Sequence, residues 1–330
     1  MPVAAAARAS RRRLLLGLAL LPLAARAASD KASFPSRPIT LIVPFAPGGV
    51  ADITARAVAQ AMAASLGQPV VIDNRPGAGG IVATQAVLQA PADGHTLLLM
   101  SNATAISVHL FKRLPYDAAR DLAPISTLGF FELALVVRND SRFRSLADLV
   151  AFGRANPGKL TIGTIAVGST QQLAAELFKS RAGIDALVVP YKGSPAVINA
   201  LRAGEIDVGF EILSPLLPQL SANVIRALAV TGEQRFPLLP DVPTVQQQGI
   251  ANYSVASWNA LAAPAGTPAA TLERLRRAAF EAVTQPALQR QLRDLGVSAR
   301  ASTPAELAAL LARETLHWGE VVRAAKIEPE

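Results

Sequence analysis

The sequence predicts an α/β protein of two lobes, each built around its own parallel sheet. Short apolar, β-branched runs alternate with stretches in which apolar residues recur at helical spacing, a pattern typical of strands and helices in a parallel sheet. The alternation stops and restarts near residue 130. A chain of 330 residues is long enough for two domains of ordinary size.

The first lobe is expected to contain three buried strands, of which the first two are each followed by a turn and a helix. The strand over residues 39–43 reads Ile-Thr-Leu-Ile-Val, and the next two are predicted at residues 70–72 and 97–100. A helix is expected over residues 50–65, and residues 75–80 form a glycine-rich turn.

In the second lobe the same alternation is expected again. Strands are predicted at residues 133–137, 160–165, 188–189, 208–210 and 225–230, and helices at 145–156, 169–182 and 195–203. The tail over residues 268–325 reads as mainly helical and is expected to pack back on the first lobe. We therefore predict a first lobe from residues 28–130 and 251–330, and a second lobe from residues 131–250.

An export signal is predicted over residues 1–27. A basic segment, Ser10 to Arg13, precedes an apolar run, Leu14 to Leu23, and Ala25-Arg26-Ala27 fits a cleavage site. Ten apolar residues are too few to cross a bilayer, which needs about twenty. The mature chain is expected to begin at Ala28 in the periplasm, and the paired arginines leave both the general and the twin-arginine export routes open.

The composition argues against several classes of function. Of the formal net charge of +8, five charges come from arginines within residues 1–27, and no basic stripe with interleaved aromatic residues remains. Nucleic-acid binding is therefore not expected. The chain has no Cys, which excludes disulfides and thiolate metal sites.

The loop from Pro44 to Gly49 is the first candidate ligand site, because it joins a strand to a helix. Gly48 and Gly49 allow a ligand to approach the backbone, and free N–H groups at a helix start favour an anion. Asp52 either contributes to this site or simply serves the first helical turn. The loop matches neither the dinucleotide fingerprint nor a Walker loop.

Two further strand-to-helix loops carry polar groups. Ser169 and Thr170 can cap the helix that follows them, donate to a ligand carboxylate, or do both. Lys192 lies in the loop before another helix, where it is either a ligand contact or an ordinary solvated lysine.

Catalysis and metal binding are not predicted. The three histidines, His95, His109 and His317, are widely spaced and match no metal-ligand pattern. Ser169 lacks the G-x-S-x-G context of a hydrolase nucleophile. No catalytic residue, cofactor or metal is therefore assigned.

Motifs along nearly the whole mature chain together resemble the Bug family, the solute receptors of tripartite tricarboxylate transporters. They are Arg37-Pro-Ile-Thr, Val43 to Asp52, Asp73 to Gly80, Asp93-Gly94, Leu114 to Asp117, Ala155 to Leu160, Leu173 to Phe178, Val189 to Gly193, Arg226 to Thr231, Leu239 to Thr244, Ala263 to Pro268 and Trp318-Gly319.

The resemblance implies a type II periplasmic binding protein fold, with the ligand in a cleft between the lobes. It implies a monomeric, non-catalytic receptor that holds a small carboxylate and delivers it to inner-membrane transporter subunits. A sensor input using the same receptor is an alternative, and an α/β enzyme acting on small acids is a weaker one. From the loops described above and the resemblance together, the predicted ligand-binding residues are Phe45, Ala46, Pro47, Gly48, Gly49, Asp52, Ser101, Asn102, Thr104, Gly168, Ser169, Thr170, Tyr191, Lys192 and Glu211.

The chain departs from the family pattern at several positions that bear on ligand identity. Gln172 stands where the family often has His, His95 where Tyr is common, and Glu211 where Asp is usual. A Pro-Asn pair common before the crossing strand is replaced by Glu132-Leu133, and the usual proline after Tyr-Lys-Gly is shifted to Pro195. The class of carboxylate therefore stays open.

Overall fold

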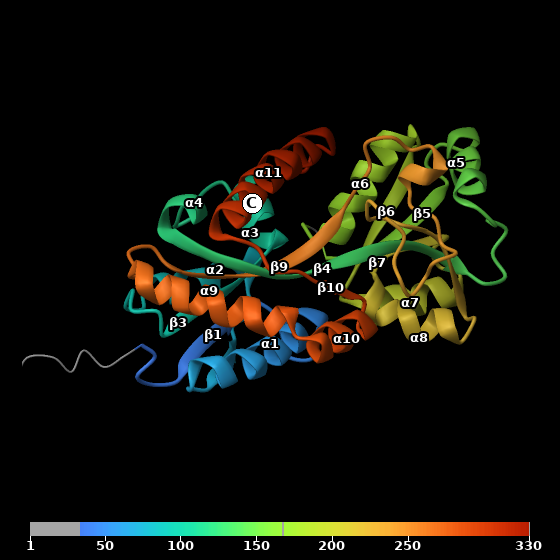
Figure 1. Cartoon of the computed structure of the whole chain (residues 1–330). Coiled ribbons are helices and arrows are strands. Elements are labelled where there is room, and N and C mark those ends of the chain that lie inside the picture. The colour runs from blue at the N-terminus through green and yellow to red at the C-terminus, as the bar shows by residue number, and fades with distance from the viewer. Residues whose placement is uncertain (1–33, 167, 330) are drawn as a thin grey trace, which may run out of the picture.

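The computed structural model describes residues 34–166 and 168–329, which form an α/β structure with ten strands in one hydrogen-bonded network (Figure 1). The export segment expected over residues 1–27 lies outside the described residues. Within the described part of the chain, no helix combines the length and apolar character needed to cross a membrane.

The first lobe is built on the first sheet. Its strands lie in the order β2 (Val70–Asn74), β1 (Ile39–Val43), β3 (Thr96–Ser101), β9 (Ala256–Pro264) and the N-terminal half of β4 (Leu122–Arg138). β1 is parallel to β2 and β3, whereas β9 runs antiparallel between β3 and β4. The short strand β10 (Val297–Ala299) pairs with β4 beyond this path.

Helices cover both faces of the first sheet, which explains the unbroken apolar run of β1. Ile39 and Leu41 face a core shared with α1 and α9, while Ile42 faces a second core shared with α2, α3 and α11. The helices of this lobe are α1 (Val50–Leu66), α2 (Ile81–Leu88), α3 (Asn102–Leu110), α4 (Ala118–Asp121), α9 (Ala269–Thr284), α10 (Pro286–Asp294) and α11 (Pro304–Ala324), with a 3-10 turn η2 (Ala78–Gly80).

The second lobe is built on the second sheet, which shares β4 with the first. The C-terminal half of β4 pairs with β7 (Val208–Ile212) on one side and with β8 (Ile225–Val230) on the other. β7, β5 (Leu160–Ile165) and β6 (Ala186–Tyr191) continue the sheet as parallel neighbours. The remaining elements are α5 (Leu146–Ala155), α6 (Thr170–Ala182), α7 (Ser194–Ala203), α8 (Leu213–Ser221) and the 3-10 turn η3 (Gln246–Gln248).

Strand β4 passes from one lobe to the other within two residues. Glu132 is paired with Ala256 on β9, and Leu133 is paired with Ile212 on β7. The buried Thr231 hydroxyl accepts a hydrogen bond from the Leu133 amide at 3.1 Å and donates one to the Val255 carbonyl at 2.7 Å. This side chain therefore ties β4 to the segment that returns towards β9.

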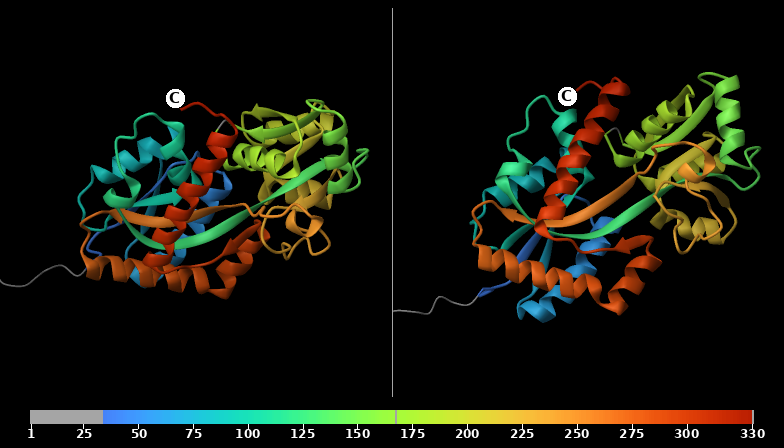
Figure 2. Two further views of the ribbon diagram at one scale, coloured as in Figure 1. Left: turned by 90° about the horizontal axis from the view of Figure 1, so that it is seen from above. Right: turned by 45° about the horizontal axis from the view of Figure 1, so that its top comes forward.

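Helix α11 also bridges the lobes. Figure 2 shows it rising beside α3 and reaching towards the second lobe, where it contacts α6. Leu307 and Leu311 near its start and Val321 near its end belong to one apolar cluster, which also includes Leu177 of α6. The C-terminal helix thus adds a packing contact between the lobes, beside the two segments through which the chain passes from one lobe to the other.

The strands predicted at residues 39–43 and 160–165 are confirmed without change of boundary. The strand expected at residues 133–137 is the end of a longer one, because β4 begins at Leu122. The C-terminal tail is mainly helical, as predicted, and includes β10. Strand β9 was not predicted, because its alanine-rich sequence has little intrinsic strand preference.

Glu132 places a carboxyl group at the crossing between the lobes, where burial raises its pKa to about 7. Its Oε2 atom is buried and has no hydrogen-bond partner in the described structure, and a Cβ at Gly232 would lie only 2.8 Å from its carboxyl carbon. The folded chain therefore keeps a proton here at pH values where the unfolded chain, with an ordinary pKa of 4.5, has lost it.

We predict that Glu132 makes the protein less stable as the pH rises from about 4.5 to about 8. In this range the unfolded chain has already lost the Glu132 proton, whereas the folded chain holds it until the pH passes the raised pKa. Glu132→Gln should flatten this dependence. Relative to the parent, the variant should gain at most about 3 kcal/mol across that range, measured by urea unfolding. Glu233→Gln, at an exposed neighbouring position, is the control. Parallel pH profiles for the parent and Glu132→Gln would contradict the prediction.

Candidate functional site

A cavity of about 370 Å³ lies where the two lobes face each other. The first lobe supplies Phe45 after β1, the glycines of the turn over residues 77–80, and Ser107 and Leu110 of α3; the second supplies Gly168 and Ser169 before α6. The carboxyl ends of β1, β3 and β5 all lead into these segments, the position at which open α/β sheets bind ligands. The volume suits a small molecule.

The loop from Pro44 to Gly49 is held in place by Asp52, which is only 2% exposed. Its Oδ2 atom accepts from the Gly48 amide at 2.9 Å and from Arg56 Nε at 3.0 Å, and its Oδ1 atom accepts from Asn74 Nδ2 at 2.8 Å. Asn74 Nδ2 also donates to the Phe45 carbonyl. Asp52 therefore acts on this loop as a positioning residue.

The charge on Asp52 is stabilised by these partners. Burial, the largest single influence, raises the pKa of the carboxyl group, but the hydrogen bonds from Arg56, Gly48 and Asn74 together outweigh it and the pKa is lowered. The loop is therefore anchored most strongly when Asp52 is ionised.

The tip of the same loop is open. Gly48 has φ +86°, a conformation that favours glycine, whereas Gly49 has φ −76° and forms the N-cap of α1. A Cβ at Gly49 would meet nothing closer than the Ala46 carbonyl oxygen at 3.9 Å. Ala46 and Pro47 are exposed beside these glycines. A side chain at Gly49 would therefore occupy open space without straining the backbone.

The start of α6 forms the opposing wall. Ser169 caps this helix, since its hydroxyl accepts from the Gln172 amide at 3.2 Å, and the Gly168 amide donates to Gln172 Oε1 at 2.8 Å. Thr170, the first residue of α6, is buried. Gly168 packs so closely on Leu110 that any side chain there would collide with it. The capping role foreseen for Ser169 is confirmed.

The polar residues after β3 are engaged within the first lobe. Ser101 caps α3 by accepting from the Ala103 amide, and Thr104 completes a capping box. Asn102 is 1% exposed and donates to the Ala256 carbonyl, while its Oδ1 atom lacks a hydrogen-bond partner in the described structure. Thr104 lines a different cavity, between α3, α4 and α11.

Tyr191, Lys192 and Glu211 follow or end strands of the second sheet, outside the lining of the 370 Å³ cavity. Lys192 is exposed and Tyr191 is partly buried. Glu211 is fully buried, and its Oε1 atom accepts from Gln171 Nε2 at 2.6 Å and from the Ile212 amide at 2.8 Å. Burial raises the pKa of Glu211, although the hydrogen bonds from Gln171, Ile212 and Ser194 oppose the shift.

The structure thus brings Phe45, Gly168 and Ser169 to one cavity and adds lining residues that the sequence did not assign. The turn over residues 77–80 was visible as a glycine-rich run but carries no polar side chain to mark it as a site. Ile327 and Glu328, beyond the last helix, also line the cavity, and no local signal announces them. Glu328 is the only charged residue in this lining within the described chain, and as an acidic side chain it opposes the binding of an anion. The groups left to hold an anion are backbone amides and the hydroxyls of Ser107 and Ser169.

Comparison with known proteins identifies relatives over almost the whole chain. Residues 54–327 match the model of the tripartite tricarboxylate transporter family receptor. The solved structure of the periplasmic binding protein BugD is 28% identical, with a TM-score of 0.78 over 90% of this chain and 100% of that one.

Two similar structures hold small dicarboxylates. One is Rpa4515 from R. palustris with adipate, which is 33% identical with a TM-score of 0.81 over 90% of this chain and 100% of its own. The other is MatC from Rhodopseudomonas palustris with bound malate, which is 31% identical with a TM-score of 0.76 over 88% of this chain and 100% of its own.

We predict that Asp52→Asn weakens the anchoring of the loop over residues 44–49. At neutral pH it should lower the unfolding free energy by about 1.5–3 kcal/mol, the range for hydrogen bonds to a charged group. Because the pKa of Asp52 is lowered, its contribution is present above the ordinary value of 3.8 and is lost as the pH falls through the lowered value. The difference between parent and variant in urea unfolding should therefore shrink in acid.

The matched control for this measurement is Asp73→Asn, which removes a more exposed carboxylate paired with Arg75. A surface pair of this kind contributes about 0–1 kcal/mol. Equal losses of stability in the two variants would show that Asp52 does not anchor the loop as its contacts indicate.

Proposed function

Since the chain belongs to the tripartite tricarboxylate transporter receptor family, whose members are binding proteins and not enzymes, we propose that it binds a small organic carboxylate in the cavity between Phe45 and Ser169. We propose further that it is a periplasmic monomer that delivers this ligand to inner-membrane transporter subunits. Adipate in one relative and malate in another support a short dicarboxylate as the first candidate.

The observation that carries the proposal is that helix starts from both lobes line a cavity whose described residues include no cation. The first amides of a helix have no acceptor within the helix and carry a partial positive charge. The N-cap of α2, Gly80, and the N-cap of α6, Ser169, line the cavity from opposite lobes, whereas the loop before α1 reaches it through Phe45. A carboxylate can therefore accept hydrogen bonds from both lobes without an arginine.

Ligand binding from both sides favours closure of the lobes. We propose that residues 28–130 with 251–330 move against residues 131–250, and that the ligand stabilises the arrangement in which it touches both. The change of partners along β4 at Glu132 and Leu133 supports a hinge at this place.

A thermal-shift screen over mono-, di- and tricarboxylates, aromatic acids and amino acids tests the proposed function. A ligand at about 100 times its dissociation constant should stabilise the protein by roughly 2.7 kcal/mol. We expect a short dicarboxylate to raise the melting temperature and to be recovered unchanged after incubation. Chemical turnover, or the absence of any shift from carboxylates at saturating concentration, would contradict the proposal.

The variants Gly49→Val and Lys192→Ala then test how the carboxylate is held. Gly49→Val places a side chain beside the amides at the start of α1 and should abolish binding in isothermal titration by keeping a carboxylate away from them. The protein should stay folded, because Gly49 has a φ of −76° and a side chain at this N-cap occupies open space at a cost of about 1 kcal/mol. Lys192→Ala should weaken binding less, since its ammonium is exposed and hydrated. The opposite ranking would exclude capture by the backbone.

Export is proposed from the order of basic, apolar and small residues over positions 8–27. We expect mass spectrometry of a periplasmic extract to find a mature chain beginning at or near Ala28. A full-length chain retained in the cytosol would contradict this proposal without bearing on ligand binding.

A further inference from the structure

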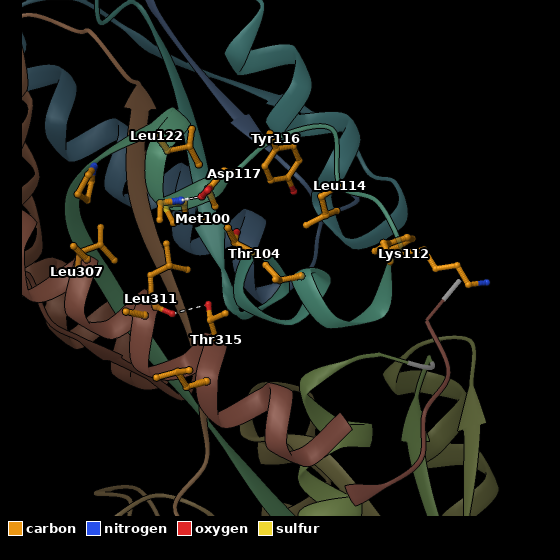
Figure 3. A pocket seen from close by; sticks show the side chains of 18 residues that line it. Met100, Thr104, Lys112, Leu114, Tyr116, Asp117, Leu122, Leu307, Leu311 and Thr315 are labelled. Carbon is orange, nitrogen blue, oxygen red and sulfur yellow. Dashed lines mark hydrogen bonds between the residues drawn. The ribbon is translucent and has the colours of Figure 1, made fainter. Parts of the chain in front are cut away.

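A second cavity of about 640 Å³ lies within the first lobe, between α3, α4 and α11 (Figure 3). Its walls are mainly apolar: Val108 and Phe111 come from α3 and its end, and Leu307 and Leu311 come from α11. Val108 and Leu316 at this site are 44% and 72% exposed. The cavity is large enough for a molecule with two aromatic rings.

Helix α3 separates this cavity from the one between the lobes. Thr104, Val108 and Phe111 follow the three- and four-residue spacing of one helix face and line the second cavity. Ala103, Ser107 and Leu110 line the cavity between the lobes from the other side of the same helix. The two cavities are therefore distinct, although Phe111 borders both.

The charged residues of the second cavity do not offer a partner to an ionised ligand. Asp117 caps α4, where its carboxylate accepts from the Ala119 and Arg120 amides. The ammonium of Lys112 points away from the cavity (Figure 3). An anion placed inside would lose its hydration without gaining a counter-charge, which is costly.

One polar group does face inward. Tyr116 is 8% exposed, and its hydroxyl is directed towards Thr104 and Leu114 (Figure 3). This hydroxyl makes no hydrogen bond within the described structure. Burial raises the pKa of Tyr116, and the nearby Thr84 side chain, whose hydroxyl donates to the Gly80 carbonyl, opposes the shift. A buried hydroxyl without a partner is uncommon, and a ligand acceptor would satisfy it.

We propose that this cavity is a second ligand site, which binds a small uncharged apolar molecule carrying one hydrogen-bond acceptor for Tyr116. The apolar walls supply the affinity through buried area, and the tyrosine hydroxyl orients the ligand. The site selects against the anions that the cavity between the lobes is proposed to bind.

Two fluorescent probes that differ in charge test the site. N-phenyl-1-naphthylamine is uncharged, and 1-anilinonaphthalene-8-sulfonate is its sulfonated analogue. We expect the uncharged probe to bind the mature protein at least about tenfold more tightly, because the sulfonate finds no cation inside. Malate and adipate should not displace it. Equal affinities for the two probes, or displacement by these dicarboxylates, would overturn the proposal.

Tryptophan substitutions on α11 that fill the cavity test whether the probe binds there. Ala312 is exposed and lines the cavity, whereas Ala309 is exposed on the same helix outside the lining. Ala312→Trp should weaken binding of the uncharged probe at least about tenfold, and Ala309→Trp should leave it unchanged. Ala308→Trp, also exposed in the lining, replaces Ala312→Trp if that variant fails to fold. Equal binding by Ala309→Trp and a folded lining variant would place the probe elsewhere and overturn the proposal.

The role of the tyrosine is tested with a matched pair of competitors. Acetophenone carries a carbonyl acceptor and ethylbenzene does not. Tyr116→Phe should weaken displacement of the probe by acetophenone about two- to tenfold, the range for one neutral hydrogen bond, and leave displacement by ethylbenzene unchanged. An equal effect on both competitors would show that the hydroxyl does not hold the ligand.

Discussion

The chain passes between the lobes through β4 and the segment from Thr231 to Val255, and both passages meet at one buried hydroxyl. Because Thr231 contacts the Leu133 amide and the Val255 carbonyl at once, the two crossings are held together at the level where β4 changes sheets. The starts of α3 and α6 lie in the two lobes that these crossings connect, so the crossings fix their relative position. In the closure proposed above, a small change of backbone angles here would move α6 towards or away from α3.

The sequence predicted those parts of the fold that depend on local periodicity. β1 and β5 are buried on both faces, so their apolar runs mark them without knowledge of their neighbours. The first half of β4 contains Pro124, Gly129 and Glu132, which interrupt such a run. β9 is rich in alanine and becomes a strand because it lies between β3 and β4. These two strands depend on pairing between distant segments, which local patterns do not record.

The residues of the candidate site likewise fall into those that local sequence patterns predict and those that only the packing of distant segments reveals. Phe45, Gly168 and Ser169 could be predicted because each lies at a strand-to-helix junction, and the carboxyl ends of parallel strands point to a common edge. Ser107, Leu110 and Ile327 reach the cavity only through the packing of α3 and the path of the C-terminal segment. Asp52 was visible in its motif, but its partner Asn74 lies at the end of β2, so its positioning role required the structure.

The absence of a cation from the described lining of the cleft cavity has a consequence for recognition. A helix start offers amides whose direction is set by the backbone and whose protonation does not change with pH. Such donors would bind a carboxylate group that reaches them, and they would not contact the part of the ligand that lies between two carboxylates. The length and shape of the ligand are then left to the apolar and glycine walls, including Leu110 and Gly168, which meet across the cleft. In the proposed mode of binding, the main chain recognises the charge of the ligand and the closeness of the lobes selects its size. Substitutions in the walls should therefore alter the preferred ligand more readily than the capacity to bind an anion.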